Sequence, residues 1–291
     1  MDLRKAQRRQ ARIKMGLQGP SGSGKTYSSL FIGYGLTEDW SKIVVIDTEN
    51  HSADLYSKLG TYNVLSLQQP FSPERYIEAI EVCEKAGMEV IIIDSISQEW
   101  EGRGGILEVH GNMTGNSFTN WNKVTPRHNA FVQKILQSSC HLIATIRSKQ
   151  DYVLSEKNGK YVPEKVGLKG VTREGMDYEF TLVLELDIKH NATATKDRTG
   201  IFMDKPPWII TEATGQRIKS WCMADATLED ALQKVRSATT TDQVRQIYKA
   251  YPLLQKELKS HCIARNKEID SPVVSDVVNP KTDDHGTGKN E

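Results

Sequence analysis

The stretch that decides the fold lies near the start of the chain and reads Gly19-Pro20-Ser21-Gly22-Ser23-Gly24-Lys25-Thr26, followed by Tyr27. It matches the pattern G-x-x-x-x-G-K-[ST] in full, and it lies between an apolar run, Ile13 to Leu17, and a helix-like segment. In that setting glycines let backbone N–H groups surround a phosphate at a helix N-terminus. Lys25 is expected to reach the β- and γ-phosphates and the Thr26 hydroxyl to bind Mg²⁺. We therefore expect this stretch to bind ATP with Mg²⁺, the alternative being a glycine-rich turn that fits by chance.

Further apolar runs alternate with helical patterns along the first half of the chain. The runs are Ile43 to Asp47, Val64 to Leu67, Val90 to Asp94 and His141 to Ile146. Continuous Val, Ile and Leu stretches are typical of parallel strands covered on both faces. Ser72-Pro73 and Thr125-Pro126 each combine a capping hydroxyl with a proline, which predicts a helix start. The pattern predicts an α/β fold with a mostly parallel sheet.

The pattern changes after residue 147. Asn158-Gly159 between Tyr152-Val153-Leu154 and Tyr161-Val162 predicts a β-hairpin, and Glu179 to Asp187 with Ala192 to Thr195 predicts antiparallel strands at the end of the sheet. From Thr227 the spacing of apolar residues is helical, and Thr240 to Gln243 has the form of a capping box. We therefore expect a basic arm at 1–12, a core at 13–223, a helical subdomain at 224–270 and a disordered tail at 271–291.

Composition narrows the class of protein. The chain has 291 residues, of which 38% are hydrophobic and 26% charged, and a net charge of +1, which suits one α/β domain with a small appendage. No apolar run approaches the length of about 20 residues that a membrane span needs, and the basic start leads into a glycine-rich loop instead of an apolar signal segment. Four widely spaced cysteines form no CxxC pair. We therefore expect a cytoplasmic protein without a membrane partner, with ordinary thiols.

Two acids follow predicted strands and are candidate catalytic groups. Asp94 ends the most apolar strand, where it can hold the Mg²⁺ shell with help from Ser95. Glu49 follows the strand that ends at Asp47, at the edge where open α/β sheets bind ligands, and its carboxylate can activate water. The alternatives are a capping acid at 94 and a solvated loop acid at 49.

The stretch Val45 to Gly60 and the stretch Ile91-Ile92-Ile93-Asp94-Ser95 resemble the RecA-type recombinases. With the glycine-rich loop, the resemblance covers roughly residues 13 to 210 and implies a RecA-like P-loop fold, with Glu49 on the catalytic glutamate and Asp94 on the Walker B aspartate. More closely, the chain resembles phage-encoded RecA-like ATPases linked to single-strand annealing, which implies the cytoplasm of a bacterial host. RecA-like sites are completed between subunits, so the resemblance also implies a homo-oligomer, as a filament or a ring, with ATP at its interfaces.

Other residues gain roles from this resemblance. Lys196 and Arg198, within Thr195 to Gly200, match basic residues that reach a neighbour's ATP, although a charged surface turn is the alternative. In place of a γ-phosphate-sensing glutamine, the chain offers Thr145, Arg147 or, slightly late, Gln150.

Two loops and the N-terminus are candidate nucleic-acid contacts. Glu101 to Asn120 is rich in Gly, Asn and Thr, and Arg147 to Arg173 matches the DNA-binding loop of RecA-like proteins. Basic residues track phosphates and aromatic rings stack on bases. The candidates are Lys149, Tyr152, Lys157, Lys160, Lys165, Lys169 and Arg173. Acids in the same loop favour the alternative of a solvated hairpin. The basic run of Arg4, Lys5, Arg8, Arg9, Arg12 and Lys14 is either an arm for nucleic acid or a neighbouring subunit, or a solvated tail.

Together these features predict an ATPase whose turnover is stimulated by single-stranded DNA, acting in phage-type recombination or strand annealing, with a single-strand-binding protein as a further candidate partner. A GTPase would need N-K-x-D after a strand, and Asn266-Lys267-Glu268-Ile269-Asp270 misses that spacing. Two alternatives remain open: a replicative helicase loader or motor, and a nucleotide-gated DNA-binding scaffold without DNA-stimulated turnover.

Overall fold

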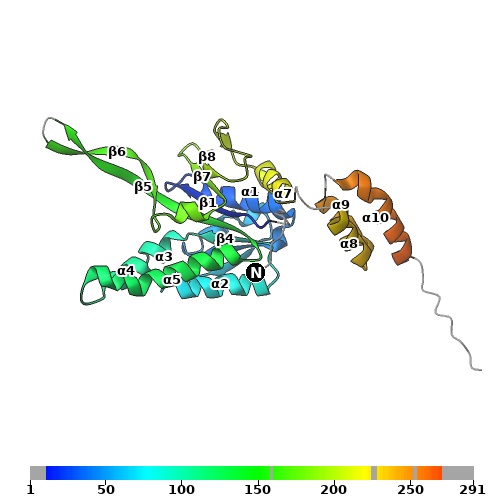
Figure 1. Ribbon diagram of the computed structural model, residues 1–291, viewed down its shortest axis with the longest axis horizontal. Coiled ribbons are helices and arrows are strands. Elements are labelled where there is room, and N and C mark those ends of the chain that lie inside the picture. The colour runs from blue at the N-terminus through cyan, green and yellow to red at the C-terminus, as the bar shows by residue number, and fades with distance from the viewer. Residues whose placement is uncertain (1–10, 158–159, 224–227, 252–253, 271–291) are drawn as a thin grey trace, which may run out of the picture. The chain divides into compact units, whose positions relative to one another are not determined.

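The computed structural model describes residues 11–157, 160–223, 228–251 and 254–270, and within 150–168 it describes the backbone. The chain divides into two compact units, Met1–Asp225 and Ala226–Glu291. The larger unit is an α/β domain, and the smaller unit consists of helices (Figure 1). The predicted basic arm up to residue 10 and the predicted disordered tail lie outside the described residues. No described helix is long and apolar enough to cross a membrane.

A mostly parallel sheet forms the centre of the larger unit, which confirms the predicted fold class. Its strands lie in the order β3-β2-β4-β5-β1-β7-β8-β9. All neighbouring pairs from β3 to β7 are parallel, and β7–β8 and β8–β9 are antiparallel. The strands are β1 (Lys14–Gly19), β2 (Ile43–Asp47), β3 (Asn63–Ser66), β4 (Val90–Asp94), β5 (His141–Lys157), β7 (Leu182–Leu186), β8 (Asn191–Asp197) and β9 (Trp208–Ile209). The carboxyl ends of β1, β2 and β4 therefore meet at one edge.

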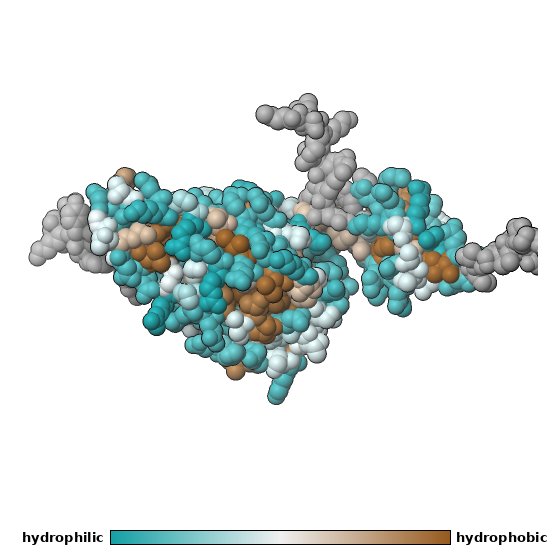
Figure 2. Space-filling model, turned by 90° about the horizontal axis from the view of Figure 1, so that it is seen from below, coloured by the Kyte–Doolittle hydropathy of each residue, from teal (hydrophilic) through white to brown (hydrophobic). Residues whose placement is uncertain are grey.

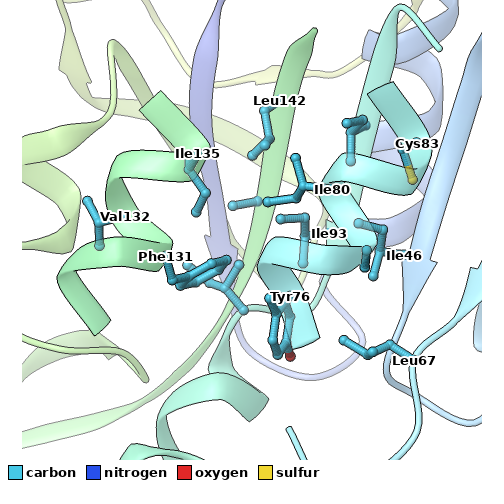
Figure 3. Packing of buried hydrophobic residues seen from close by; sticks show 14 of the residues in the cluster. Ile46, Leu67, Tyr76, Ile80, Cys83, Ile93, Phe131, Val132, Ile135 and Leu142 are labelled. Atoms are coloured by element: carbon cyan, nitrogen blue, oxygen red, sulfur yellow. The ribbon is translucent and has the colours of Figure 1, made fainter. Parts of the chain in front are cut away.

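Helices cover both faces of this sheet (Figure 1). On one face, α2 (Pro73–Lys85) and α5 (Ser117–Gln137) pack against the strands, and Tyr76 and Phe131 lie with ring centroids 5.2 Å apart (Figure 3). On the other face lie α1 (Lys25–Thr37) and α7 (Glu212–Met223). The contact between α1 and α7 requires glycine, because a Cβ on Gly35 would lie 2.1 Å from the Glu212 carbonyl oxygen. The face turned to the viewer in Figure 2 is mainly hydrophilic, with apolar patches between the polar areas.

Shorter elements complete the larger unit. They are η1 (Trp40–Lys42), η2 (Ser52–Leu59), α3 (Ser97–Glu101), α4 (Ile106–Gly111) and α6 (Met176–Glu179). The predicted loop Glu101 to Asn120 thus contains α4 and the first turn of α5.

The β5 strand is much longer than the predicted His141 to Ile146. Beyond Arg147 it pairs with β6 (Lys160–Gly170) as an antiparallel hairpin that extends away from the sheet (Figure 1). Lys157 pairs with Lys160, so the turn has two residues, as the Asn158-Gly159 signal predicts. The predicted hairpin is confirmed. We call this β5–β6 hairpin, residues 148–170, the arm; it is distinct from the basic N-terminal segment predicted at 1–12.

The helix start predicted at Thr125-Pro126 is wrong. Helix α5 begins at Ser117, and the side chain of Asn116 caps it by accepting from the N–H groups of Phe118 and Thr119. Pro126 lies inside the helix. Proline has no N–H, so the carbonyl of Asn122, one turn earlier, has no helical donor. Both residues are exposed, so water can donate to that carbonyl.

Lys14 was predicted to belong to the basic run, but it is the first residue of β1 and is buried. Its ammonium donates to the carbonyls of Ser138 and Cys140, at 2.7 and 2.5 Å. Burial lowers the pKa of Lys14 to about 8. This side chain therefore serves the fold and cannot reach a polyanion.

The smaller unit contains α8 (Leu228–Ser237), α9 (Thr241–Ala250) and α10 (Gln255–Asp270). The predicted capping box is present, because Thr240 accepts from the Gln243 N–H and the Gln243 side chain accepts from the Thr240 N–H. Ala231, Val235, Val244 and Leu258 are among its buried apolar residues.

Candidate nucleotide-binding site

The loop between β1 and α1 has the geometry that the glycine-rich motif predicts. Gly22 and Gly24 adopt positive φ angles of 80° and 86°, which side chains disfavour. The Lys25 ammonium donates to the carbonyls of Gly19 and Pro20, both at 2.9 Å. The lysine thus lies across its own loop, where it can exchange these carbonyls for phosphate oxygens.

The charge of Lys25 is balanced by acids from the neighbouring strands. Burial lowers the pKa of Lys25 below its usual range, and the negative charges of Asp94 and Glu49 act in the opposite direction. A bound polyphosphate would add to this stabilisation of the ammonium form.

Asp94 and Thr26 form the candidate Mg²⁺ site. Asp94 ends β4 and is buried, and its carboxylate accepts from the hydroxyls of Thr26 and Thr145, both at 2.5 Å. Burial raises the pKa of Asp94, and these two hydrogen bonds counteract the rise. A carboxylate and a hydroxyl in direct contact beside a phosphate-binding loop are oxygen ligands of the kind Mg²⁺ prefers, so the residues fit this ion.

Glu49 lies beside this pair, after the end of β2. Its backbone N–H donates to the Asp47 carboxylate at 2.6 Å, which fixes the turn that carries it. Its carboxylate accepts from the Ser95 hydroxyl at 3.0 Å and from the Arg147 guanidinium through Nε, at 3.0 Å, and through Nη2. The predicted partnership of Ser95 with the site therefore takes the form of a contact with Glu49.

Of the three candidate γ-phosphate sensors, the structure describes the side chains of two, Thr145 and Arg147, and they lie in different surroundings. Thr145 is fully buried and donates to Asp94. Arg147 pairs in register with Gly19 at the edge of the phosphate-binding loop and lines the cavity. The side chain of Gln150 lies outside the described residues. Arg147 is thus the sensor candidate with access to a bound nucleotide.

Lys25, Thr26, Glu49, Asp94, Ser95 and Arg147 line one cavity of about 960 Å³, a volume sufficient for a nucleotide. Sequence reasoning missed several residues that line it: Tyr56, His190, Ile209 and Ile210. Tyr27, a predicted binding residue, lines the cavity too, and its ring packs against those of Phe31 and Tyr56 with centroids 4.8 and 5.8 Å away. No local motif marks the missed residues: Tyr56 lies in η2, and sheet pairing and turns far along the chain bring His190, Ile209 and Ile210 there.

Lys196 and Arg198 lie away from this cavity. In the β7–β8 register Lys196 pairs with Val183, near the start of β7, whereas the phosphate-binding loop follows the carboxyl end of β1. The Lys196 ammonium donates to the carbonyls of Asp177, at 2.9 Å, and Tyr178. Lys196 and Arg198 thus do not contribute to this chain's own site, and a role for them in a neighbouring subunit's site stays a prediction.

The predicted DNA contacts are only partly described. Lys149 pairs with Glu101 at 2.6 Å, Lys169 lies 4.0 Å from Glu174, and Arg173 donates to Asn129 at 3.4 Å. The side chains of Tyr152, Lys157, Lys160 and Lys165 lie outside the described residues. All four cysteines are buried, and the described part of the chain contains no cluster of three or more His, Cys, Asp or Glu residues for a metal.

The fold and this cavity define a P-loop nucleotide-binding protein with a mostly parallel central sheet. Residues 11–218 match the family model described as AAA domain, so the chain belongs to that family and carries an AAA-type ATPase domain. None of the curated proteins matches the sequence.

Proposed function

We propose that this protein hydrolyses ATP with Mg²⁺ and acts on single-stranded DNA in phage-type recombination or strand annealing. The observation that carries the proposal is the meeting of Lys25, the Thr26–Asp94 pair and Glu49 in one cavity. These are the groups that phosphoryl transfer to water requires: a phosphate-binding cation, ligands for the metal and a carboxylate for the attacking water.

Each residue has a separate task in this mechanism. The loop N–H groups and Lys25 hold the β- and γ-phosphates, and Thr26 and Asp94 would hold Mg²⁺, which when bound would offset negative charge on the phosphates. Glu49 orients the attacking water and accepts its proton. Ser95 and Arg147 hold the Glu49 carboxylate, and Arg147 supplies a second cation near the charge that develops on the γ-phosphoryl group.

The arm supports the DNA part of the proposal. Its strand β5 is continuous from the sheet, and Arg147, Ser148 and Lys149, at its base, line the nucleotide cavity. The Arg147 N–H donates to the Ser97 hydroxyl at 3.0 Å, and its carbonyl accepts from the Val171 N–H at 2.7 Å. A change at the nucleotide thus has a direct mechanical route to the basic and aromatic residues of the arm.

An oligomer, filament or ring, is also part of the proposal. Lys196 and Arg198 lie near the start of β7, away from this chain's cavity, and we assign them to another subunit's nucleotide. In the assembled state these cations would neutralise charge on the γ-phosphoryl group in trans. A single-strand-binding protein is a candidate further partner.

Steady-state ATP hydrolysis with and without single-stranded DNA tests the proposal. We expect DNA to raise turnover of the wild type, and we expect Lys25→Ala and Arg198→Ala to abolish it. If DNA has no effect while the wild type still binds ATP, the recombination function falls and a nucleotide-gated scaffold is the better account.

Strand annealing by the purified protein separates the proposal from its other rival. A recombination protein is expected to anneal complementary strands alone. A helicase loader or motor would show DNA-stimulated hydrolysis without annealing.

A further inference from the structure

The turn between β7 and β8 is built rigidly next to the phosphate-binding loop. Asp187 holds it: one carboxylate oxygen accepts from the N–H groups of Lys189 and Asn191, both at 2.8 Å, and the other accepts from the Asn191 side chain at 3.0 Å. These hydrogen bonds lower the pKa of Asp187. His190 lies inside this turn with a positive φ of 68°. The turn therefore presents the His190 ring in a fixed direction.

That ring contacts the backbone of the phosphate-binding loop. His190 Nδ1 lies 3.0 Å from the Ser23 carbonyl oxygen, and a Cβ on Gly24 would lie 3.2 Å from the same nitrogen. A carbonyl oxygen can only accept, so Nδ1 carries a hydrogen and donates it. Nε2 has no hydrogen-bond partner among the described residues, and the ring lines the nucleotide cavity.

The hydrogen bond fixes the direction of one peptide unit. The Ser23 carbonyl and the Gly24 N–H belong to the same planar, trans peptide group, so they point in opposite directions. A donor that fixes the Ser23 carbonyl therefore also fixes the direction of the Gly24 N–H, one of the loop N–H groups available to an anion. Gly24, with its φ of 86°, has no Cβ to oppose rotation of this peptide, so an external hydrogen bond is needed to restrain it.

We propose that His190 is a positioning residue for the phosphate-binding loop, holding the Ser23–Gly24 peptide in its anion-binding orientation through Nδ1. This inference rests on the proposed binding of ATP at the same loop. His190 is 167 residues from Ser23 in the sequence, so it couples the antiparallel end of the sheet to nucleotide affinity.

Three substitutions of His190 separate the roles of the two ring nitrogens. Asn places a side-chain donor where Nδ1 lies, whereas Gln places its polar group closer to Nε2. Lys189→Ala is the matched control, because Lys189 is exposed, lies in the same turn and keeps its backbone N–H donation to Asp187 when the side chain is removed. The readouts are the Kd of a fluorescent ATP analogue with Mg²⁺, and KM and kcat for ATP hydrolysis.

We expect His190→Ala and His190→Gln to raise Kd and KM about fivefold to tenfold, the loss of one net hydrogen bond, and to change kcat less than about twofold. His190→Asn should recover most of this affinity, and Lys189→Ala should match the wild type. Wild-type affinity in His190→Ala, or recovery by Gln but not by Asn, would overturn the inference and leave the proposed function intact. Failure of the wild type to bind the analogue would overturn the proposed function, and this inference with it.

Discussion

Glu49 has both carboxylate oxygens engaged by neighbouring side chains. Arg147 binds both oxygens, and Ser95 donates to one of them. A general base works only when it is held toward the water that it activates, and the guanidinium restricts the carboxylate to one orientation. The same guanidinium provides positive charge at the edge of the phosphate-binding loop. In the proposed mechanism Arg147 therefore acts on turnover more than on ground-state nucleotide binding.

Replacing Arg147 tests this account. Arg147→Ala should lower kcat at least about tenfold and change the Kd for ATP only a few-fold, because the lost interactions matter most as charge develops. Arg147→Lys retains the charge but not the bidentate geometry, so an intermediate kcat is expected. A higher kcat in Arg147→Ala would contradict the account and would make the ion pair inhibitory.

His141 gives the fold a dependence on acidic pH. It is buried, and its Nδ1 accepts from the Ile13 N–H at 3.2 Å. Burial, with the nearby cations Arg12, Lys14 and Lys219, lowers the pKa of His141 from 6.5 to about 3. Between these values the unfolded chain binds a proton that the folded chain does not, so the folded state loses stability as pH falls from 6.5 toward 3.

His141→Asn should weaken this dependence, because its amide oxygen can still accept from Ile13 without titrating. Between pH 7 and pH 4 we expect the wild type to lose as much as about 3 kcal/mol more stability than the variant. Urea unfolding at the two pH values gives this difference. Equal losses in the two proteins would show that another group dominates.

The meeting of Lys25, Thr26, Asp94 and Glu49 in one cavity could be predicted from the sequence because each follows a local pattern at the end of a strand. The contact between Arg147 and Glu49 spans 98 residues, and that between His190 and Ser23 spans 167. No local pattern reports such pairs. They follow from the order of the strands and from the Asp187 turn.

Among the elements, α5 shows how tertiary structure overrides a local signal. Thr125-Pro126 has the chemistry of a helix start, yet the better cap is Asn116, and the buried face that includes Val124, His128 and Phe131 requires a continuous helix against the sheet. Strand β5 differs from prediction for a related reason. Its apolar run ends at Ile146, but backbone pairing with β6 extends the strand to Lys157.

Pro126→Ala should stabilise α5. The substitution supplies the missing N–H for the Asn122 carbonyl at an exposed position, which we expect to raise the free energy of unfolding by about 1 kcal/mol, after allowing for the freer unfolded chain. Urea unfolding followed by tryptophan fluorescence reports it, since Trp121 lies in this helix. Lys123→Ala, also exposed, is the control and should change stability by less than about 0.5 kcal/mol. A less stable Pro126→Ala would mean that the proline contributes packing.

For the whole molecule, the strand order explains why one edge of the sheet carries the chemistry. The parallel strands β1, β2, β4 and β5 bring Gly19, Glu49, Asp94 and Arg147 together although the chain separates them widely. At the carboxyl ends of these strands the arm leaves the sheet next to the nucleotide cavity. Lys196 and Arg198 lie near the opposite ends of the parallel strands. On this arrangement rests our proposal that nucleotide hydrolysis is linked to a nucleic acid and to a second subunit.

The central claim is that this cavity hydrolyses ATP with Glu49 as the group that activates water. The most direct test is phosphate release from ATP·Mg²⁺ by the wild type and Glu49→Gln, with the Kd for ATP measured on the same samples. The account predicts a loss of at least about 100-fold in turnover for Glu49→Gln with nearly unchanged Kd. Equal turnover in the two proteins would contradict it.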